Sequence, residues 1–381
     1  MFNHNPYKPK MKRIYFFRVF QALLVFSLAF TLTNCGNIDN PLEELGGGSG
    51  SSVSVTSIEL NKTTLDMKVG DADVTLTATV DPAGTAVTWS SDNAAATVTD
   101  GVVHAVAAGT AIITATAGDK SATCTVTVTE VYTAKDYKEG SWDVTNNKVV
   151  FTKQTAPSDP TVVADASTDV TWSGWYTVSG EVTITGTVTL KADTHLILQD
   201  GATLNCQTID FSNSSGYTLY IYGQDKGDGK LNISYSSATA LWGSSNGKIE
   251  IHGGEITAES TSGRGLIAKG IRVYGGKLTA TSTGYDGIHF DAGNFEVYGG
   301  EVEGESTYSN GTAIFSSNTL KVYGGKVKAT GGASGKGFNC KLLSGTDNIK
   351  FYFSDNGTDW SSGDSYDPAA PAPGDRYAKA E

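Results

Sequence analysis

Apolar and polar positions alternate in a ten-residue pattern that the chain repeats four times. Each copy has an alternating run, an aromatic residue or His, two glycines and a second alternating run. Alternation with a period of two predicts strands, and the glycines predict a bend between them. The first glycines of successive pairs lie 22, 24 and 25 residues apart, and no amphipathic helix can be read between the copies. The copies are Ile249–Ala258, Ile271–Ala280, Phe295–Gly304 and Leu320–Ala329.

Strand-and-turn repeats of this length stack as coils, because a single unit cannot bury its own apolar side. Without helices, the stack is typical of a parallel β-helix, in which neighbouring coils lie roughly 4.8 Å apart. The pattern extends upstream through Leu219–Ile233, with an inserted loop at 224–228, and more loosely through Leu196–Leu204. We therefore predict a right-handed parallel β-helix, a solenoid, over residues 172–345.

Two outward positions of the repeat alternate in charge from one coil to the next. If the coils stack in register, every carboxylate lies between cations, whereas a slip of one coil would pair like charges. Each surface pair contributes only a fraction of a kcal/mol, so the pattern mainly fixes the register. We interpret it as a structural ladder rather than a catalytic or polyelectrolyte-binding cluster. The two series are Glu250, Arg272, Glu296 and Lys321, and Lys230, Glu255, Lys277, Glu301 and Lys326.

Residues 55–130 form a separate block of strongly alternating sequence. Val74–Val80 and Cys124–Val128 are expected to be half-buried strands, with turns at Asp81–Gly84 and Asp100–Gly101. About seven short strands in a segment of this length predict a β-sandwich. The predicted fold class is therefore all-β, with an Ig-like β-sandwich followed by the parallel β-helix.

Four segments of this block carry specific motifs, namely Ile58–Asn61, Val69–Asp71, Val87–Ser91 and Gly109–Thr116. Through them the block resembles the bacterial Ig-like group 2 family over nearly its whole length. That family is common in surface adhesins and as a spacer in glycan-binding and glycan-degrading proteins. The resemblance implies a spacer rather than a binding domain, with Trp89 in its core.

The first 35 residues read as a targeting segment. A basic stretch precedes an apolar run, Val19–Leu32, which is shorter than the roughly 20 residues that a membrane span requires. With Leu32–Cys35 the segment resembles a bacterial lipoprotein signal, which implies that Cys35 carries the lipid. A secreted protein with a cleaved signal is the alternative, and either Met1 or Met11 could be the start.

The remaining segments connect and close these parts. Residues 36–54, rich in Gly and Ser, are expected to be a flexible tether. Together with a lipid on Cys35, this tether gives the expected localisation, which is the outer membrane, as a surface-exposed lipoprotein of the Bacteroides type. Residues 131–171 are expected to be a transition and N-terminal cap, with Trp172–Tyr176 covering the first coil, since an uncovered sheet end invites aggregation. Residues 346–381 are expected to cap the other end.

Charge limits the choice of partners. The formal net charge is −12, and the first 34 residues hold five of the 28 basic residues and no acid, so the remainder carries −17. A nucleic-acid-binding face must be basic, so we expect no nucleic acid partner. An acidic polysaccharide would be repelled unless a cation bridges it. We expect a monomer, with free buried thiols at Cys124, Cys206 and Cys340.

The aromatic residue before each glycine pair provides a first candidate binding surface. Tyr274, Tyr298 and Tyr323, together with Tyr222 and His252, would stack outward as a flat strip. Their expected spacing of about 4.8 Å is close to the length of one pyranose unit, so the strip suits sugar rings. The alternative is that each aromatic ring only covers its bend and stacks on its neighbour.

A second candidate surface follows the segment Tyr285–Asp291. By alternation His289 and Asp291 point outward, and equivalent segments of the other coils would extend this surface into a partly apolar stripe. Exposed patches of this kind often mark binding sites. The predicted stripe consists of Trp242, Ile267, His289 and Phe315.

The sequence Asp-Gly-Ile that starts at Asp286 resembles a motif of β-helical proteins that bind polygalacturonate with calcium. The resemblance covers about Leu219–Ala329 and implies a carbohydrate ligand, with Asp286 and Asp291 as candidate calcium ligands. That family shows two adjacent acids, whereas Tyr285 precedes Asp286 here. The alternative is a ladder salt bridge, because Asp286 would lie beside Arg264 in register.

Pectate lyases and polygalacturonases are also β-helices, but their chemistry needs more carboxylates than this sequence offers. A lyase needs several carboxylates on calcium and a basic residue, and a hydrolase needs paired carboxylates. Asp286 and Asp291 are the only acid pair on one coil outside the ladders, so we expect no catalytic residues. The expected function is non-enzymatic carbohydrate binding or adhesion, by a solenoid presented on an Ig-like spacer. A polysaccharide lyase or hydrolase and a structural stalk are the alternatives, and calcium is the only cofactor considered.

Overall fold

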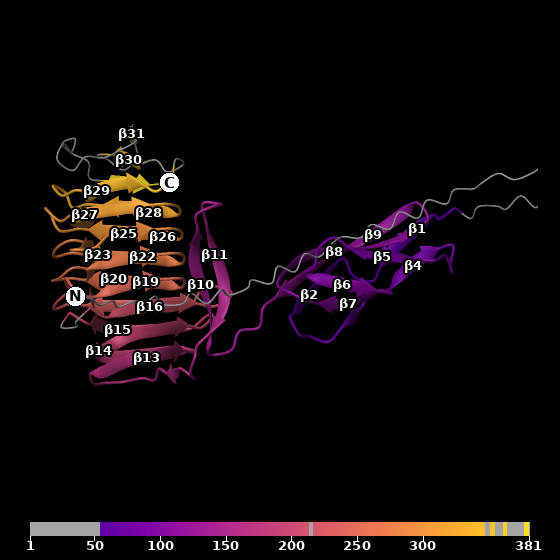
Figure 1. Cartoon of the computed structure of the whole chain (residues 1–381), viewed down its shortest axis with the longest axis horizontal. Coiled ribbons are helices and arrows are strands. Elements are labelled where there is room, and N and C mark those ends of the chain that lie inside the picture. The colour runs from indigo at the N-terminus through magenta and orange to yellow at the C-terminus, as the bar shows by residue number, and fades with distance from the viewer. Residues whose placement is uncertain (1–53, 213–215, 347–350, 355–360, 364–376, 381) are drawn as a thin grey trace, which may run out of the picture. The chain divides into compact units, whose positions relative to one another are not determined.

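The computed structural model describes residues 54–212, 216–346, 351–354, 361–363 and 377–380. Every regular element within these ranges is a strand, and the chain forms an Ig-like domain followed by a β-solenoid, as predicted (Figure 1). No helix in these ranges is long and apolar enough to cross a bilayer. The predicted signal peptide, Cys35, nearly all of the tether and much of the C-terminal cap lie outside the described residues.

Nine strands make up the Ig-like domain. One sheet has the order β2-β9-β8-β5, a second has the order β3-β7-β6, and β1 pairs with β4. Buried apolar and exposed polar side chains alternate along the strands, so the sheets share a core. The strands are β1 Ser57–Leu60, β2 Thr64–Lys68, β3 Val74–Thr75, β4 Ala78–Asp81, β5 Thr88–Ser91, β6 Ala96–Thr99, β7 Val102–Ala105, β8 Gly109–Ala117 and β9 Lys120–Thr129.

The segment 74–80, predicted as one strand, is instead divided between two sheets. β3 pairs with β7 and β4 pairs with β1. The Leu76 N–H continues the first pairing by donating to the Gly101 carbonyl oxygen at 2.8 Å, and the Thr77 carbonyl oxygen begins the second by accepting from the Asn61 N–H at 3.0 Å. The other predicted strand, Cys124–Val128, lies within β9, and Trp89 packs against both apolar clusters of the domain, as expected.

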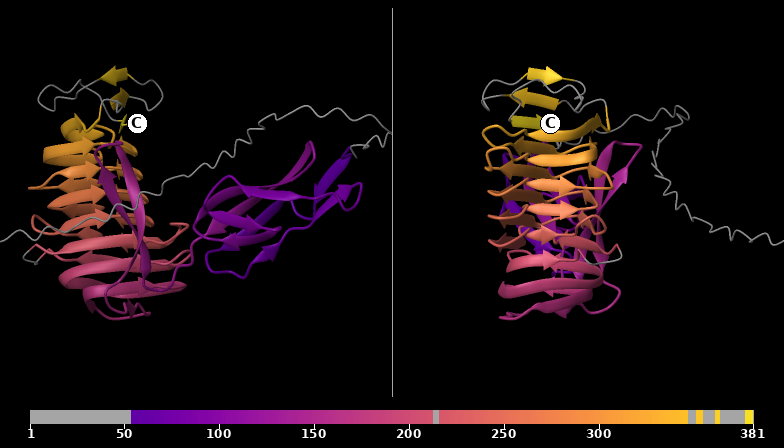
Figure 2. Two further views of the ribbon diagram at one scale, coloured as in Figure 1. Left: turned by 45° about the vertical axis from the view of Figure 1, so that its right-hand side comes forward. Right: turned by 90° about the vertical axis from the view of Figure 1, so that its left-hand side faces the viewer.

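The solenoid is a stack of coils whose strands pair in parallel with the equivalent strands of the next coil (Figures 1 and 2). Most coils contribute one strand to each of three faces. Face A precedes the glycine bend, face B follows it, and face C completes the coil. Face A contains β16 Thr218–Gly223, β19 Lys248–Ile251, β22 Gly270–Val273 and β25 Phe295–Val297; face B contains β17 Lys230–Tyr235, β20 Glu255–Ser260, β23 Lys277–Ser282, β26 Glu301–Ser306 and β28 Lys326–Thr330; face C contains β18 Leu241–Trp242, β21 Leu266–Ala268 and β24 Ile288–Phe290.

Longer strands turn the corner between faces at both ends of the stack. β27 and β29 each run from face C into face A, and the short strands that follow are antiparallel, with β32 pairing with β28. These strands are β13 Val170–Val178, β14 Glu181–Leu198, β15 Thr203–Asp210, β27 Ile314–Val322, β29 Phe338–Ser344, β30 Phe351–Ser354, β31 Ser361–Gly363 and β32 Tyr377–Ala380.

The glycine pairs form the bend between faces A and B, as predicted. The second glycine of a pair lies in the left-handed region, with φ of +78° at Gly276 and +76° at Gly300, where side chains are strained. Inward side chains of all faces join one continuous apolar core. Cys206 and Cys340 are free thiols in this core, and burial raises the pKa of both thiols to about 12.

Both charge series stack in the predicted register. Arg272 lies 3.0 Å from a Glu296 oxygen and 3.7 Å from a Glu250 oxygen, and these three residues are Cα partners on adjacent coils. On face B, Lys230 lies 3.2 Å from Glu255. The alternating charges therefore stabilise the register of coils, as the sequence indicated.

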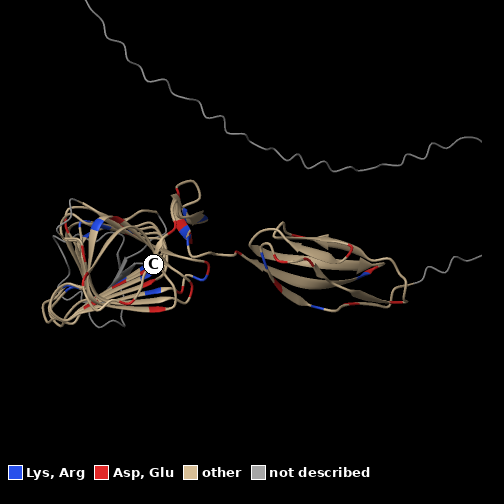
Figure 3. Cartoon of the chain, turned by 90° about the horizontal axis from the view of Figure 1, so that it is seen from below, with Lys and Arg blue, Asp and Glu red and all other residues tan. Residues whose placement is uncertain are grey.

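Viewed along the stack, the sheets surround a common interior (Figure 3).

The parallel stack begins before the predicted residue 172. β12 (Thr161–Val162) pairs with β13, and Ala166 forms a bridge to Ile184. Trp172 is buried in the solenoid core and its ring stacks on Tyr176 at 4.9 Å, so this segment is a strand of the stack, with β12 on one side and β14 on the other, rather than a separate cover. Residues upstream of the predicted start join the ladder because an open first coil would leave its backbone groups unpaired.

A β-hairpin occupies most of the predicted transition segment, and it lies along the side of the stack rather than across its end (Figures 1 and 2). β10 (Asp136–Asp143) and β11 (Lys148–Thr155) pair only with each other among the described strands. At the base of the hairpin, the Gln224 side-chain amide donates to the carbonyl oxygens of Thr133 and Asp136 at 2.7 and 2.8 Å. Side chains, not a strand ladder, therefore hold the hairpin on the solenoid.

Candidate functional site

The four aromatic residues before the glycine pairs, together with Tyr222 before Gly223, form one stacked column on face A. Neighbouring ring centroids lie 4.5 to 5.0 Å apart, and the ring planes differ by at most 20°. The repeat produces this column because it places a ring at the same position of every coil. In order, the column consists of Tyr222, His252, Tyr274, Tyr298 and Tyr323.

The hairpin packs against this column, so the column is not a fully open outward strip, although Tyr274, Tyr298 and Tyr323 keep part of their surface exposed. The Tyr137 ring lies 4.3 Å from that of Tyr222, and the Trp142 ring lies 5.6 Å from Tyr298 and 5.4 Å from Tyr323. Tyr274 packs against the backbone of Gly140. Burial, reinforced by neighbouring negative charge, raises the pKa of the Tyr298 hydroxyl. The rings of both elements therefore shield each other in part from water.

His252 connects the column to the hairpin through its two ring nitrogens. Its Nδ1 accepts a hydrogen bond from the Gly140 N–H at 3.0 Å. Its Nε2 is buried 3.3 Å from a Glu250 oxygen, although the geometry is too oblique for a hydrogen bond. Burial alone would raise the pKa of Glu250, but His252 and Arg272 outweigh burial and lower it. This arrangement fixes the hairpin and offers no space for a ligand.

The predicted stripe on face C is present in the predicted register. Its residues are successive Cα partners, and the His289 and Phe315 rings stack at 4.9 Å. Trp242 is 36% exposed, whereas His289 is only 8% exposed because Phe315 and two carboxylates surround it. The stripe therefore offers Trp242 as an accessible ring and His289 as a fixed polar group.

Asp286 and Asp291 lie on opposite sides of the His289 ring. Nδ1 lies 3.3 Å from Asp286 and Nε2 lies 2.8 Å from Asp291. Asp286 also accepts from Arg264 Nε at 3.2 Å and from the Thr312 N–H at 3.2 Å, so the predicted salt bridge is present. Burial opposes ionisation of Asp286, but these partners outweigh burial and lower its pKa.

These carboxylates do not fit the predicted calcium site. Calcium requires six to eight oxygen ligands, whereas the oxygens of Asp286 already bind Arg264, His289 and a backbone N–H. Within the described ranges, no cluster of three or more His, Cys, Asp or Glu residues could hold a metal ion. Asp286 and Asp291 instead hold His289 and Arg264 in place beside the stripe.

Two exposed tyrosines lie at the corner between faces B and C, beside this cluster. Tyr285 is 53% exposed and Tyr308 is 45% exposed, with ring centroids 6.3 Å apart. The Arg264 guanidinium lies 5.6 Å from the centre of the Tyr285 ring. The sequence analysis did not select these rings as ligand contacts, although each corner loop between faces B and C on these two coils carries one tyrosine.

Buried serines stabilise the corner loop that carries Tyr285. The Ser282 hydroxyl oxygen accepts from the N–H groups of Gly284 and Tyr285 at 3.1 and 2.8 Å. The Ser306 hydroxyl donates to the Tyr285 carbonyl oxygen at 2.5 Å. Both serines are almost fully buried and are Cα partners on adjacent coils. The exposed ring therefore projects from a rigid backbone.

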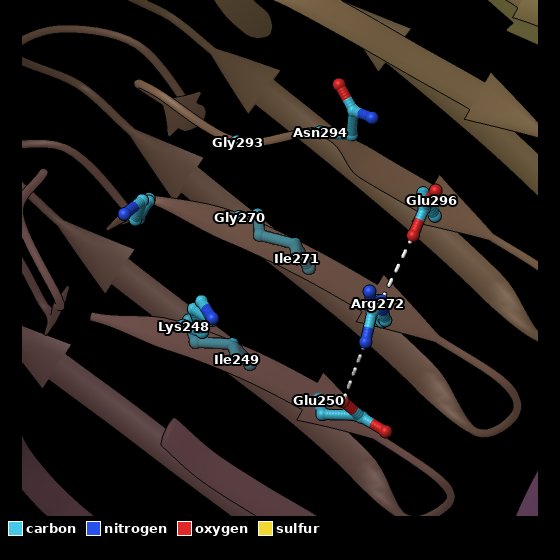
Figure 4. A pocket seen from close by; sticks show the side chains of 10 residues that line it. Lys248, Ile249, Glu250, Gly270, Ile271, Arg272, Gly293, Asn294 and Glu296 are labelled. Carbon is cyan, nitrogen blue, oxygen red and sulfur yellow. Dashed lines mark hydrogen bonds and ion pairs between the residues drawn. The ribbon is translucent and has the colours of Figure 1, made fainter. Parts of the chain in front are cut away.

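A shallow groove of about 200 Å³ lies on face A, next to the corner with face C (Figure 4). Gly270 and Gly293, which have no side chains, contribute to its lining, and Lys248, Lys269 and Asn294 contribute polar groups. The charge ladder forms its other side, with Arg272 between two glutamates as Figure 4 shows. Sequence reasoning did not find this groove, because its glycines lie outside the repeated motif.

Comparison with known families identifies part of the chain. Residues 54–128 match the family described as bacterial Ig-like domain (group 2), which agrees with the resemblance seen in the sequence. None of the curated proteins matches the chain significantly. The solenoid therefore has to be interpreted from its own geometry.

Proposed function

We propose that this protein is a non-enzymatic carbohydrate-binding module whose solenoid binds a glycan and whose Ig-like domain acts as a spacer. The observation that supports the proposal is that exposed rings and fixed polar groups share face C and its corner with face B. Trp242 on face C and Tyr285 and Tyr308 at the corner offer apolar ring faces. Arg264 beside Tyr285 and Asp291 beside His289 offer hydrogen-bonding groups on the same side of the solenoid. Sugar rings present apolar faces and hydroxyl edges, so they suit such a surface.

The column on face A is a weaker candidate for this role. Tyr274, Tyr298 and Tyr323 were expected to bind sugar, but the hairpin packs on them. The hairpin therefore interrupts the column as a continuous surface on which a glycan could stack. We therefore assign the glycan to the stripe and the corner tyrosines, and we assign the column a role in holding the hairpin.

A polysaccharide hydrolase remains the alternative, because Asp286 and Asp291 flank one imidazole. Glycoside hydrolysis needs one carboxylic acid that is protonated at working pH, and such a group has a raised pKa. The pKa of Asp286 is lowered, which makes it a poor proton donor. The pair therefore favours binding over catalysis, and a depolymerisation assay on the bound glycan tests this choice.

Replacement of the exposed rings is expected to weaken glycan binding. Trp242→Ala and Tyr285→Ala should each reduce affinity about tenfold, or about 1.4 kcal/mol, because each removes a stacking surface. Retention on immobilised neutral glycans measures the effect, with Phe151→Leu on the hairpin as the matched control. Normal retention of both alanine variants would contradict the site. Release of shortened product would favour the enzyme, and absence of retention by the wild type would favour the structural stalk.

We also propose that the protein is a lipoprotein anchored to the outer membrane, with the solenoid exposed at the cell surface. This proposal depends on the sequence around Cys35, which lies outside the described residues. Cys35→Ser should abolish lipid attachment and leave the protein unprocessed or released, because a thioether link requires the thiol. Membrane fractionation checks this result. Unchanged membrane retention of the variant would contradict the anchor.

A further inference from the structure

We propose that the groove on face A binds the carboxylate of an acidic sugar through Lys248 and Lys269. The proposal extends the proposed glycan binding and rests on it. The two lysines come from adjacent coils, at the corner where face C turns into face A. Lys248 is exposed and Lys269 is half-buried, so both ammonium groups can be reached from solvent. Asn294 adds an amide donor on the next coil.

The balance of charge in the groove supports an anionic ligand. Arg272 forms an ion pair with both Glu250 and Glu296, so these three side chains carry a net charge of −1, and Lys248 and Lys269 bring the net charge of the groove lining to +1. Neither lysine has a carboxylate partner within 4.0 Å among the described side chains. Two unneutralised cations on an otherwise acidic chain form a local site for a negative group.

The shape of the groove favours a flat ligand of limited size. Gly270 and Gly293 lack side chains, and a Cβ at Gly293 would lie 2.7 Å from the Lys269 carbonyl oxygen. Added Cβ atoms at both positions would meet backbone of the neighbouring coil, so the two glycines let the coils pack closely here and leave backbone in this part of the groove lining. A volume of about 200 Å³ is below the range of pockets for drug-sized ligands, and it suits a single sugar ring.

The groove is also close to the proposed glycan site along the chain. Asp291 directly follows β24 on face C, and Asn294 lies three residues later at the groove. Three residues span at most about 10 Å, or two sugar units. A glycan that stacks on face C can therefore place a neighbouring acidic unit in the groove. The lysines would supply the positive charge that the sequence reasoning assigned to calcium.

The test compares a hyaluronan hexasaccharide with its carboxyl-reduced form, which differs only in the acidic groups. Titration calorimetry with the whole mature chain in EDTA removes calcium as a bridge. We expect at least tenfold tighter binding of the acidic form, and this preference should decrease as salt increases. Lys248→Ala/Lys269→Ala should abolish the preference and leave binding of the reduced form unchanged. Lys248→Arg/Lys269→Arg should retain at least part of the preference.

The matched control is Lys277→Ala/Lys326→Ala, which removes the same charge from exposed positions on face B. This variant should keep the preference, so equal losses in both alanine variants would indicate bulk charge and overturn the groove. A preference that survives Lys248→Ala/Lys269→Ala would also overturn it. Suppose that the reduced form binds, that Trp242→Ala weakens this binding, and that the wild type shows no preference for the acidic form. Only the groove assignment then fails. If neither form binds the wild type, the proposed function fails as well.

Discussion

Gly300→Ala is expected to destabilise the solenoid by about 3–4 kcal/mol. Gly300 has φ of +76°, which costs an L residue about 1–2 kcal/mol. A Cβ there would also lie 2.5 Å from the Gly276 carbonyl oxygen and 2.9 Å from the Gly275 carbonyl carbon. Backbone atoms of a packed coil cannot move aside cheaply, and overpacking adds about 1–3 kcal/mol. Urea unfolding of the isolated variant measures the loss as a change in midpoint.

Gly201→Ala separates the two causes of this loss. Gly201 has a similar φ of +72°, but no atom lies within 4 Å of an added Cβ. It should cost only about 1 kcal/mol, from backbone strain alone. Equal losses in the two variants would mean that contact between coils at the bend contributes nothing, which would contradict the close packing of the glycine pairs.

Tyr137→Ala is expected to cost about 3 kcal/mol and to release the hairpin from the solenoid. Tyr137 is 7% exposed, and its ring contacts Trp175 at 5.2 Å and Tyr222 at 4.3 Å. Truncation of a large buried aromatic ring leaves a cavity and typically costs about 3–5 kcal/mol. The hairpin has no strand ladder to the solenoid, so loss of this contact should free it rather than unfold the coils.

Hydrogen exchange at the Gly140 amide reports the state of the hairpin, because this N–H donates to His252. It should exchange much faster in Tyr137→Ala, whereas amides of face B should keep their protection. Val144→Ala is the control, since Val144 lies at the hairpin tip and is 76% exposed. If the Gly140 amide stays protected in Tyr137→Ala, the ring contacts do not hold the hairpin.

The sequence was sufficient to predict which outward residues share a column. Coils stack in parallel, so residues at the same position of the motif must be neighbours. The alternation of Glu250, Arg272 and Glu296 therefore predicted their contacts, and the same logic aligned Trp242 with His289. Positions within the repeat are determined locally, by strand period and by the glycine bend, and both can be read from the chain.

The sequence could not predict what covers each column. The hairpin precedes the solenoid in the chain and meets it only through side chains, so no periodic signal links Trp142 to Tyr298. The contacts of Asp286 were only partly predictable. His289 lies three residues later on the same coil, but the Thr312 N–H comes from the loop of the next coil. The groove depends on Gly270 and Gly293, which belong to corners of variable length. Loops and long-range contacts therefore decided which candidate surface stays open.

The match between hairpin and column has a consequence for the number of coils. Along β10, the five steps from Tyr137 to Trp142 cover about 17 Å at 3.4 Å per residue. Over the same stretch, the rings advance from Tyr222 to the space between Tyr298 and Tyr323, and three and a half coils at about 4.8 Å also cover about 17 Å. The length of β10 therefore matches the height of the coils that it spans. Repeat proteins usually gain or lose units freely, but here an added or deleted coil in this stretch would leave Trp142 facing the wrong ring, so hairpin and coil number can change only together.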